Sequence, residues 1–321
     1  MSILVLSRPR LLDVTTSLIA DELKTLRRLG DHEIDTAGWN EKTRIHDLAE
    51  ASAIQRKPHS LEVDFGEMVA LVAQVNTYFQ LTGDGVEDSL LRSKTLGEWV
   101  DLIAVARGSG TCNIALNTSG NTKALKVYVH QWHDLVEETA YFAQYLEDVL
   151  DDRVTRIVAL APRHSIYGLI FSVLLPEFRN VPVVSGDSAL AMVRARKLQA
   201  GDVVVGDPLI WRQLSRQRLA FPNKVLGLTT AALNSIGLAE ADVAGQLRQQ
   251  NLSAMVEIYG SDETAGIGAR IDTDECFRLL PRWRREDSYE AILRDDQQGR
   301  RYSLAETLDW LDHRRFSPLM A

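Results

Sequence analysis

The segment from Asn117 to Lys126 carries side chains that suit a bound polyphosphate. It follows a strand-like apolar run and holds hydroxyl groups, a glycine and two lysines. Glycine lets backbone N–H groups approach phosphate oxygens, hydroxyls donate hydrogen bonds to them, and ammonium groups offset their charge. The Walker pattern is absent, because the second glycine and the GK[ST] ending are missing. The segment predicts a phosphate loop of another type, and a solvated polar hairpin loop is the alternative.

A second candidate segment, residues 256–270, is an apolar strand that ends in a glycine-punctuated loop. Two adjacent carboxylates, Asp262 and Glu263, follow Tyr259 in this loop. Mg²⁺ usually binds one or two carboxylates together with phosphate oxygens, and ligands of open α/β sheets collect at the C-terminal ends of strands. The pattern predicts a magnesium site that faces the phosphate loop, and the alternative is a solvated acidic turn.

A third candidate segment, residues 161–168, also follows a strand-like run. Pro162 ends that strand, and His164 and Tyr167 stand three residues apart on one face at the start of a helix. An imidazole beside an aromatic ring can line a slot for a flat organic acid. Packing or helix capping by the same two residues is the alternative.

Alternating strands and helices must position these segments. Continuous apolar strands separated by amphipathic helices indicate a mainly parallel sheet covered on both faces, and we therefore predict an α/β fold. The expected strands are 113–117, 126–130, 157–160, 181–184, 203–205, 225–228 and 255–259. The expected helices are 132–150, one from about 166, 189–198, 209–217 and 239–249.

The two ends of the chain differ from this core. Helical spacing marks residues 12–26, 61–81 and 96–106, separated by a polar stretch over 31–58. From residue 277, strand-like runs at 277–280 and 289–293 are joined by Arg-rich turns. We expect three parts: a helical part at 1–107, an α/β nucleotide- and acyl-binding core at 108–275, and a small β-rich part at 276–321.

Composition narrows the class of protein. The chain has 321 residues, of which 45% are hydrophobic and 25% charged, and these values exclude collagen-like and fully disordered proteins. Its 36 Lys and Arg against 44 Asp and Glu give a net charge of −8, which disfavours a general nucleic-acid binder. No apolar run reaches the roughly 18 residues of a membrane span, and the first residues lack signal-peptide order. With only two cysteines, we expect a cytoplasmic protein.

In their order and rough spacing, these segments resemble the motifs of the adenylate-forming (ANL) superfamily of acyl- and aryl-CoA ligases, luciferases and adenylation domains. Residues 118–126 resemble its TSGTTGxPK phosphate loop, 161–168 its His-and-aromatic acyl-pocket motif, and 259–264 its YGxTE motif. Residues 227–233 stand where the family has an SGAAPL-like pocket strand. The short upstream region and the His/Tyr motif look most like the 4-coumarate–CoA-ligase-like branch, which activates hydroxycinnamates or hydroxybenzoates.

The resemblance implies an ANL-type large N-terminal domain and a two-step reaction. An aromatic carboxylic acid reacts with ATP, with Mg²⁺ bound, to give an acyl-adenylate. The thiol of CoA or of a holo acyl carrier protein then displaces AMP. No nucleic-acid or membrane partner is expected.

The resemblance also implies roles for individual residues. His164, near the reacting carbonyl, and Lys126, at the end of the phosphate loop, are the implied catalytic residues, and Glu263 is the implied magnesium ligand. The implied ATP-binding residues are Thr118, Ser119, Gly120, Asn121, Thr122, Lys123, Thr229, Tyr259, Gly260, Ser261 and Asp262, with Glu306 or, alternatively, Asp309 at the ribose. The implied acyl-binding residues are His164, Tyr167, Thr230, Ala231, Gly260, Gly266 and Ile267.

Some residues depart from the family pattern. Lys123 stands where the phosphate loop usually has glycine, and Asp262 replaces a threonine that donates to the α-phosphate. A carboxylate there would repel that phosphate by roughly 1 kcal/mol at 4 Å in water, so we expect Asp262 to share the Mg²⁺. The family continues into a hinge and a mobile lid domain, whereas this sequence stops at Ala321. We therefore expect the large domain alone, with slow adenylation and little thioester formation.

The segment 278–301 is rich in arginine, with Arg residues at 278, 282, 284, 285, 294, 300 and 301. It predicts a docking face for CoA phosphates or an acidic carrier protein, and a solvated surface of mixed sign is the alternative. Other functions also fit the sequence. The acyl group could pass to an amine or hydroxyl, the chain could be an inactive binding or scaffold module, or it could be an unrelated α/β nucleotide-binding enzyme.

Overall fold

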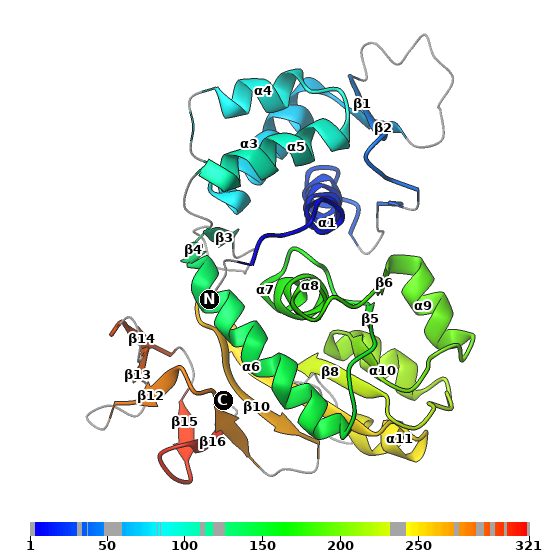
Figure 1. The fold of residues 1–321 in the computed structure, drawn as a ribbon, viewed down its shortest axis with the longest axis vertical. Helices are drawn as coiled ribbons and strands as arrows, with labels where there is room; N and C mark the ends of the chain where they lie inside the picture. The colour runs from blue at the N-terminus through cyan, green and yellow to red at the C-terminus, as the bar shows by residue number, and fades with distance from the viewer. Residues whose placement is uncertain are drawn as a thin grey trace. The chain divides into compact units, whose positions relative to one another are not determined.

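The computed structural model describes residues 4–30, 34–36, 38–47, 60–81, 83, 85–109, 113–117, 126–231, 242–272, 276–286, 292–295, 299–304 and 307–319. The chain forms two compact units that interleave along the sequence (Figure 1). Unit 1 comprises Met1–Tyr141 and Pro162–Asn180, and unit 2 comprises Phe142–Ala161 and Val181–Ala321. The three-part division expected at residues 107 and 275 stays a prediction.

Unit 1 is mainly helical, as its sequence predicts. The buried face of its first helix consists of apolar residues three or four apart, among them Leu11, Val14 and Leu18, all of which are buried. Its elements are α1 (Arg8–Leu26), β1 (Arg44–Asp47), β2 (Ser60–Val63), α3 (Phe65–Phe79), α4 (Val86–Arg92), α5 (Leu96–Ser109), β3 (Ile114–Asn117), β4 (Val127–His130), the first part of α6 (Trp132–Leu150), α7 (Ile166–Leu169), the π-helical turn η1 (Ile170–Leu174) and α8 (Leu175–Arg179).

The helix expected over 61–81 is shorter than predicted, because β2 occupies its first residues and pairs in parallel with β1. Asp64 fixes the boundary between strand and helix. Its carboxylate accepts a hydrogen bond from the Glu67 backbone N–H, and the Glu67 carboxylate accepts one from the Asp64 backbone N–H. This reciprocal capping box starts α3 at Phe65.

Unit 2 is built around a sheet with nine strands among the described residues, in the order β15-β16-β11-β10-β9-β8-β7-β5-β6. The strands from β9 to β6 run parallel, and those from β10 to β15 run antiparallel. The elements of the parallel half are the second part of α6, β5 (Arg156–Ala159), β6 (Val183–Ser185), α9 (Gly186–Arg194), β7 (Asp202–Val205), α10 (Pro208–Ser215), β8 (Leu226–Thr230), α11 (Val243–Gln249) and β9 (Ala254–Ser261).

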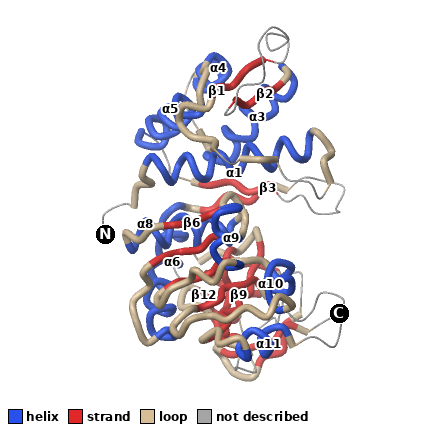
Figure 2. The backbone as a smooth tube through the Cα atoms, turned by 90° about the vertical axis from the view of Figure 1, so that its right-hand side faces the viewer, coloured by secondary structure: helices blue, strands red, loops and turns tan. Residues whose placement is uncertain are grey.

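The parallel half follows the predicted alternation of strands and helices. In β7, Val203, Val204 and Val205 are fully buried, as expected for a strand covered on both faces. Helices α9, α10 and α11 pack on one face, where Trp211 is fully buried and its indole N–H donates to the Leu228 carbonyl at 2.7 Å. Figure 2 shows these helices in blue beside the red strands.

The antiparallel half corrects two expectations. Residues after Gly260 were expected to form a glycine-punctuated loop, but Ala265–Ile271 is strand β10, paired with β9. Gly268 allows the Phe316 ring to pack closely against β10, because a Cβ on Gly268 would lie 2.7 Å from that ring. The expected turn around Arg284 is a strand as well. The elements are β10, β11 (Phe277–Leu279), β12 (Trp283–Arg285), β13 (Ile292–Asp295), β14 (Arg301–Ser303), β15 (Leu308–Trp310) and β16 (Arg315–Pro318).

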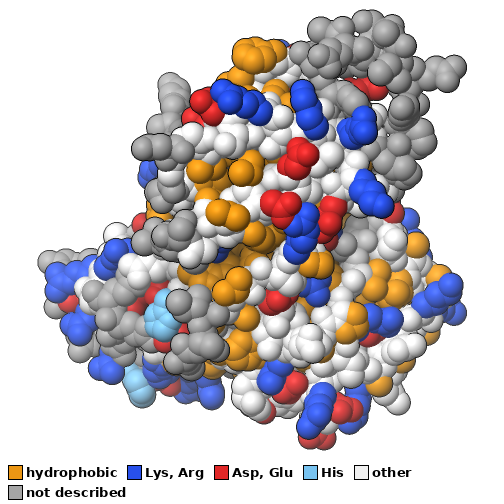
Figure 3. Space-filling view, turned by 45° about the horizontal axis from the view of Figure 1, so that its top comes forward, with side chains coloured by type: hydrophobic (Ala, Val, Ile, Leu, Met, Phe, Trp, Pro, Cys, Tyr) orange, Lys and Arg blue, Asp and Glu red, His pale blue; other side chains and the backbone are white. Residues whose placement is uncertain are grey.

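Charged side chains of both signs are interspersed on the surface. On the face drawn in Figure 3, Lys and Arg side chains lie among Asp and Glu side chains over the part of the chain that is described. None of the helices in the described part has both the length and the apolar character needed to span a membrane.

Candidate active site

The predicted phosphate loop connects the two strands of a hairpin in unit 1. Strands β3 and β4 pair antiparallel, and their last pair is Asn117 opposite Val127. The loop therefore leaves and rejoins the hairpin at two adjacent points. Lys126 immediately precedes β4, and its side chain is exposed. The other predicted loop residues lie outside the described residues and stay predictions: Thr118, Ser119, Gly120, Asn121, Thr122 and Lys123.

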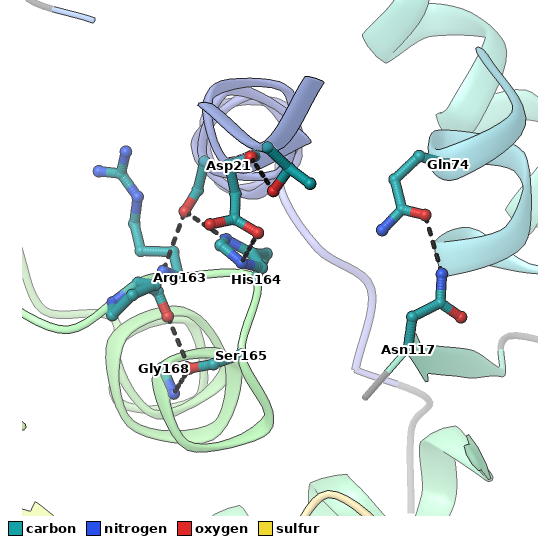
Figure 4. Close-up of polar contacts among 10 residues, drawn as sticks. Asp21, Gln74, Asn117, Arg163, His164, Ser165 and Gly168 are labelled. Atoms are coloured by element: carbon teal, nitrogen blue, oxygen red, sulfur yellow. Dashed lines mark hydrogen bonds and ion pairs between the residues drawn. The ribbon is translucent and has the colours of Figure 1, made fainter. Parts of the chain in front are cut away.

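Helix α3 holds the start of this loop. The side-chain amide of Asn117 donates a hydrogen bond to Gln74 Oε1 at 2.9 Å (Figure 4). Leu71 and Val75, which flank Gln74 on α3, are buried, so the helix that carries Gln74 is firmly packed. The partly buried amide pair fixes the side chain of the last residue before the loop.

The His-and-aromatic segment starts helix α7 through a tight backbone approach. The Ser165 hydroxyl donates to the Pro162 carbonyl at 2.8 Å and accepts from the Gly168 backbone N–H at 3.0 Å. A Cβ on Gly168 would collide with the Pro162 carbonyl, so the approach requires glycine. Ser165 is therefore the N-cap of α7, and Gly168 lets the preceding chain lie directly against the helix.

Helix α1 holds the His164 ring at both nitrogens (Figure 4). Nδ1 lies 2.9 Å from the Ser17 hydroxyl, and Nε2 lies 3.4 Å from a carboxylate oxygen of Asp21. The hydrogen bond to His164 lowers the pKa of the Asp21 carboxyl. Ser17 also accepts a hydrogen bond from the Arg163 backbone N–H at 3.1 Å. Ser17 and Asp21 stand four residues apart, so one face of α1 supplies both contacts.

The predicted acyl-binding roles of His164 and Tyr167 stay predictions. In the structure, the contacts of each side chain restrict how it could meet a ligand. His164 is held at both nitrogens, so it must release one partner before it can bind a carboxylate. Tyr167 is only 9% exposed and packs against Phe171, with ring centroids 5.1 Å apart. Contact with a ligand would therefore involve the exposed edge of the Tyr167 side chain.

In unit 2, a tight hairpin joins β9 to β10 and carries the two predicted carboxylates. The hydroxyls of Ser261 and Thr264 lie 3.0 Å apart across the turn, and the Thr264 hydroxyl donates to the Ala265 carbonyl at 3.0 Å. A Cβ on Gly260 would collide with the same Ala265 carbonyl. The turn is thus closed by hydroxyl groups and requires glycine at residue 260.

This turn presents carboxylates suited to a magnesium ion. Glu263 is exposed and makes no hydrogen bond or ion pair with the described residues, and Asp262 beside it is partly exposed. The described residues hold no group of three or more His, Cys, Asp or Glu side chains placed to bind a metal by themselves. Two adjacent carboxylates on one turn fit Mg²⁺, which takes one or two carboxylates and completes its shell with phosphate oxygens and water, and the magnesium-binding role of Glu263 stays a prediction.

Tyr259 lies in an aromatic cluster behind this turn. Its ring centroid is 5.7 Å from that of Phe277 and 5.4 Å from that of Phe316, and the residue is 9% exposed. Arg270 extends the cluster, because its guanidinium lies 4.5 Å from the Phe277 ring centroid and pairs with the buried Glu257 at 2.8 Å. Contact between Tyr259 and adenine stays a prediction.

The other predicted site residues of unit 2 differ in exposure. Thr229 is fully buried, and its hydroxyl has no hydrogen-bond partner among the described residues. Thr230 and Ala231, at the end of β8, are partly exposed. Gly266 and Ile267 are buried within β10, and their acyl-binding roles stay predictions. Asp309 is exposed on β15, and Glu306 lies outside the described residues.

Three contact residues have no counterpart among the sequence predictions: Ser17, Asp21 and Gln74. Ser17 is 147 positions from His164, and Gln74 is 43 positions from Asn117. The four-residue spacing of Ser17 and Asp21 predicts a shared helix face, but the partner of that face becomes known only from the tertiary structure.

Comparison with known proteins identifies the family. No family model matches the chain. A 4-coumarate–CoA ligase from Halorhodospira halophila is 30% identical over 305 residues, which cover 94% of this chain and 74% of that protein. A 4-coumarate–CoA ligase from Cereibacter sphaeroides is 32% identical over 314 residues, which cover 95% of this chain and 72% of that protein. The chain belongs to the 4-coumarate–CoA ligase family.

Solved structures agree with this assignment at the level of the fold. The o-succinylbenzoate coenzyme A synthetase from Bacillus subtilis, solved in complex with ATP and magnesium ion, matches with a TM-score of 0.52 at 12% identity and covers 96% of this chain and 73% of its own. A double mutant of the same synthetase, bound to a product analogue, matches with a TM-score of 0.53 at 12% identity, over 86% of this chain and 57% of its own. These structures confirm the predicted ANL-type α/β fold.

Membership of the 4-coumarate–CoA ligase family confirms the resemblance found in the sequence motifs. The chain is an enzyme of the AMP-forming acid–thiol ligase class, and its class activates acids for transfer to CoA. Among the described residues, the predicted phosphate loop starts and ends at the β3–β4 hairpin, Asp262 and Glu263 lie on the β9–β10 turn, and His164 is held by α1.

Proposed function

We propose that this chain activates an aromatic carboxylic acid, of the hydroxycinnamate or hydroxybenzoate type, as its acyl-adenylate and transfers the acyl group to the thiol of CoA. Family membership supports the reaction class, and the 4-coumarate–CoA ligases from two bacteria support an aromatic acid. The exposed Glu263 carboxylate at the end of the tight β9–β10 turn is the structural observation that carries the ATP-dependent step.

In the first step, a carboxylate oxygen of the acid attacks the α-phosphorus of ATP. A new P–O bond forms while the bond between the α-phosphorus and the bridging oxygen breaks, and pyrophosphate leaves with that electron pair. The loop between Asn117 and Val127 would hold the β- and γ-phosphates, with Lys126 offsetting their charge. His164 would orient the acid after it releases Ser17 or Asp21.

In the second step, the thiolate of CoA attacks the acyl carbon. A C–S bond forms, the bond between the acyl carbon and the phosphate oxygen breaks, and AMP leaves. The thiol proton passes to water. We propose CoA as the acceptor because the relatives are named CoA ligases, and a holo acyl carrier protein is the second acceptor for the test to compare.

Magnesium fits the residues of this site. When bound, it would neutralise charge on the phosphates. Glu263, with Asp262 beside it, would hold it, because both carboxylates are accessible on one short turn. Gly260 and the Ser261–Thr264 hydroxyl pair keep that turn tight, so the carboxylates keep their position relative to the strand ends.

The test incubates the full chain with ATP, Mg²⁺ and a panel of acids, namely 4-coumarate, 3- and 4-hydroxybenzoate and an aliphatic acid. Mass spectrometry detects acyl-AMP, and added CoA or holo carrier protein reports the acceptor. We expect acyl-AMP with the aromatic acids and the thioester with CoA. Acyl-AMP from the aliphatic acid alone would overturn the aromatic substrate class. Absence of any acyl-AMP, with retained ATP binding, would favour an inactive binding module.

A further inference from the structure

Strands β12, β13 and β14 form a three-stranded sheet that packs aromatic and apolar residues on one face and carries a row of arginines on the other. Trp283, Leu293 and Tyr302 belong to one face; Trp283 and Leu293 are buried, and the rings of Trp283 and Tyr302 meet edge to face at 5.1 Å. The register places Arg285 and Asp295 on this face as well, whereas Arg284, Arg294 and Arg301 belong to the opposite face together with Ser303. Register pairs Arg284 with Arg294 and Arg294 with Arg301, so the three arginines form one row across the opposite face.

The structure separates these arginines from Arg282 and Arg285. The Arg282 side chain is largely buried, pairs with Asp295 at 3.2 Å and lies over the Trp283 ring. Arg285 lies over the Trp310 ring at 5.2 Å. Both therefore have structural roles. Arg284, Arg294 and Arg301 are exposed, and Arg301 also pairs with Glu286 at 2.5 Å.

Placing like charges directly opposite one another on adjacent strands destabilises a sheet. Arg294 has an arginine opposite it on both sides. Glu286 offsets part of the charge at Arg301, and an anion bound across the row would offset more of it, because a guanidinium binds phosphate through paired hydrogen bonds. Adjacent strands lie about 4.8 Å apart, so the row covers roughly 10 Å. Several separated phosphate groups, rather than one, are needed to meet every guanidinium in it.

The arginine row is tied to the candidate active site within unit 2. The indole N–H of Trp283 donates to the Gly266 carbonyl at 2.6 Å, which anchors the small sheet to β10. Gly266 follows the β9–β10 turn that carries Glu263. Figure 1 shows β12, β13 and β14 as a separate small sheet in orange and red.

We propose that Arg284, Arg294 and Arg301 bind the phosphate groups of the CoA acceptor. This inference rests on the proposed function and adds the part of the protein that recognises the acceptor. CoA carries a 3′-phosphate and a 5′-diphosphate on one nucleotide, which gives the separated anionic groups that the row requires. Arg294, at the centre of the row, makes the largest contribution.

The test compares three acceptors that differ only in phosphate groups: CoA, dephospho-CoA without the 3′-phosphate, and pantetheine without any phosphate. The variants are Arg294→Glu, the charge-conserving Arg294→Lys, and Arg216→Glu as a matched control on an exposed arginine after α10. Acyl-AMP formation is measured first without acceptor. Calorimetric binding of 3′,5′-ADP reports phosphate recognition independently of catalysis.

We expect Arg294→Glu to raise the KM for CoA about tenfold or more, to raise the KM for dephospho-CoA less, and to leave the KM for pantetheine unchanged. Acyl-AMP formation should not change, and Arg294→Lys should recover part of the loss. An equal effect on CoA and pantetheine, or no effect on either, would overturn the inference while the proposed function stands. A wild-type chain that makes no acyl-AMP would instead refute the proposed function, and the acceptor site with it.

Discussion

The His164 ring places its Nε2 atom 3.4 Å from a carboxylate oxygen of Asp21, on the helix that also supplies the Ser17 hydroxyl to Nδ1. This contact ties α1 to the segment that starts α7, both within unit 1. The Asp21 side chain is 58% exposed, so solvent weakens the interaction relative to a buried pair.

The Asp21–His164 contact predicts a pH-dependent contribution to stability. The pKa of Asp21 is lowered in the folded chain by the hydrogen bond to His164. The contribution is therefore present above the unfolded pKa of about 4 and is lost as the pH falls through the lower folded value. Asp21→Asn should lower the free energy of unfolding by at most about 1 kcal/mol at pH 6 and by less near pH 3. Urea unfolding at both pH values measures this, with the exposed Asp88→Asn as control. An equal loss at both pH values would contradict the assignment.

The Gln74–Asn117 hydrogen bond predicts a selective effect on nucleotide affinity. Gln74→Met keeps the length and helix propensity of the side chain but removes the acceptor for the Asn117 amide. The Kd for ATP should rise about three- to tenfold, because the loop loses a fixed starting point, while the KM for the acid stays constant. The matched control is Gln144→Met, which removes a similar amide bond to Asp148 on the exposed face of α6. If ATP affinity falls equally in both variants, the loop does not depend on Gln74.

The close approach at Gly168 predicts a strong effect from a single methyl group. Gly168→Ala would force the Cβ against the Pro162 carbonyl and displace the chain that carries His164. We expect a loss of about 1–3 kcal/mol in stability, measured by thermal unfolding. Gly108→Ala on α5 provides the contrast, because a Cβ there has no neighbour within 4 Å. It should leave stability unchanged or raise it by up to about 1 kcal/mol.

The carboxylate turn predicts a change in magnesium requirement. Glu263→Gln should raise the Mg²⁺ concentration for half-maximal acyl-AMP formation at least about tenfold, since a charged oxygen ligand is lost. Asp262→Thr should also change this requirement or the affinity for ATP, if the two carboxylates share the ion. The exposed Asp187→Asn on α9 is the control. Unchanged behaviour of Asp262→Thr would leave Glu263 as the single carboxylate ligand.

Local sequence patterns predict the helices and parallel strands well. Helix α6 matches its expected bounds of 132–150, and the Val-rich β7 lies within one residue of its expected start. These elements follow from apolar periodicity, which the tertiary structure leaves intact. Strand β10 is different, because the glycines at 266 and 268 suggest a loop. The role of Gly268 depends on Phe316, a residue that becomes its neighbour only after the sheet forms.

Site chemistry is less predictable than the fold for a related reason. Motif spacing indicates His164 and Glu263, but side-chain orientation decides what they contact. The Arg-rich segment shows this most clearly: Arg284 and Arg285 are adjacent in sequence, yet one is exposed and the other lies over Trp310. Strand alternation separates them, and the sequence alone suggests an Arg-rich turn at that place.

The interleaving of the two units has a practical consequence for dissecting the enzyme. The chain passes between the units after Tyr141, Ala161 and Asn180. A fragment that ends at Tyr141 would deprive Ser17 and Asp21 of His164, and deprive Ser7 of its hydrogen bonds to Glu177. Cleavage of one peptide bond cannot separate the two units, because each consists of two segments of the chain. To isolate unit 1, residues 142–161 would have to be replaced by a short linker between Tyr141 and Pro162.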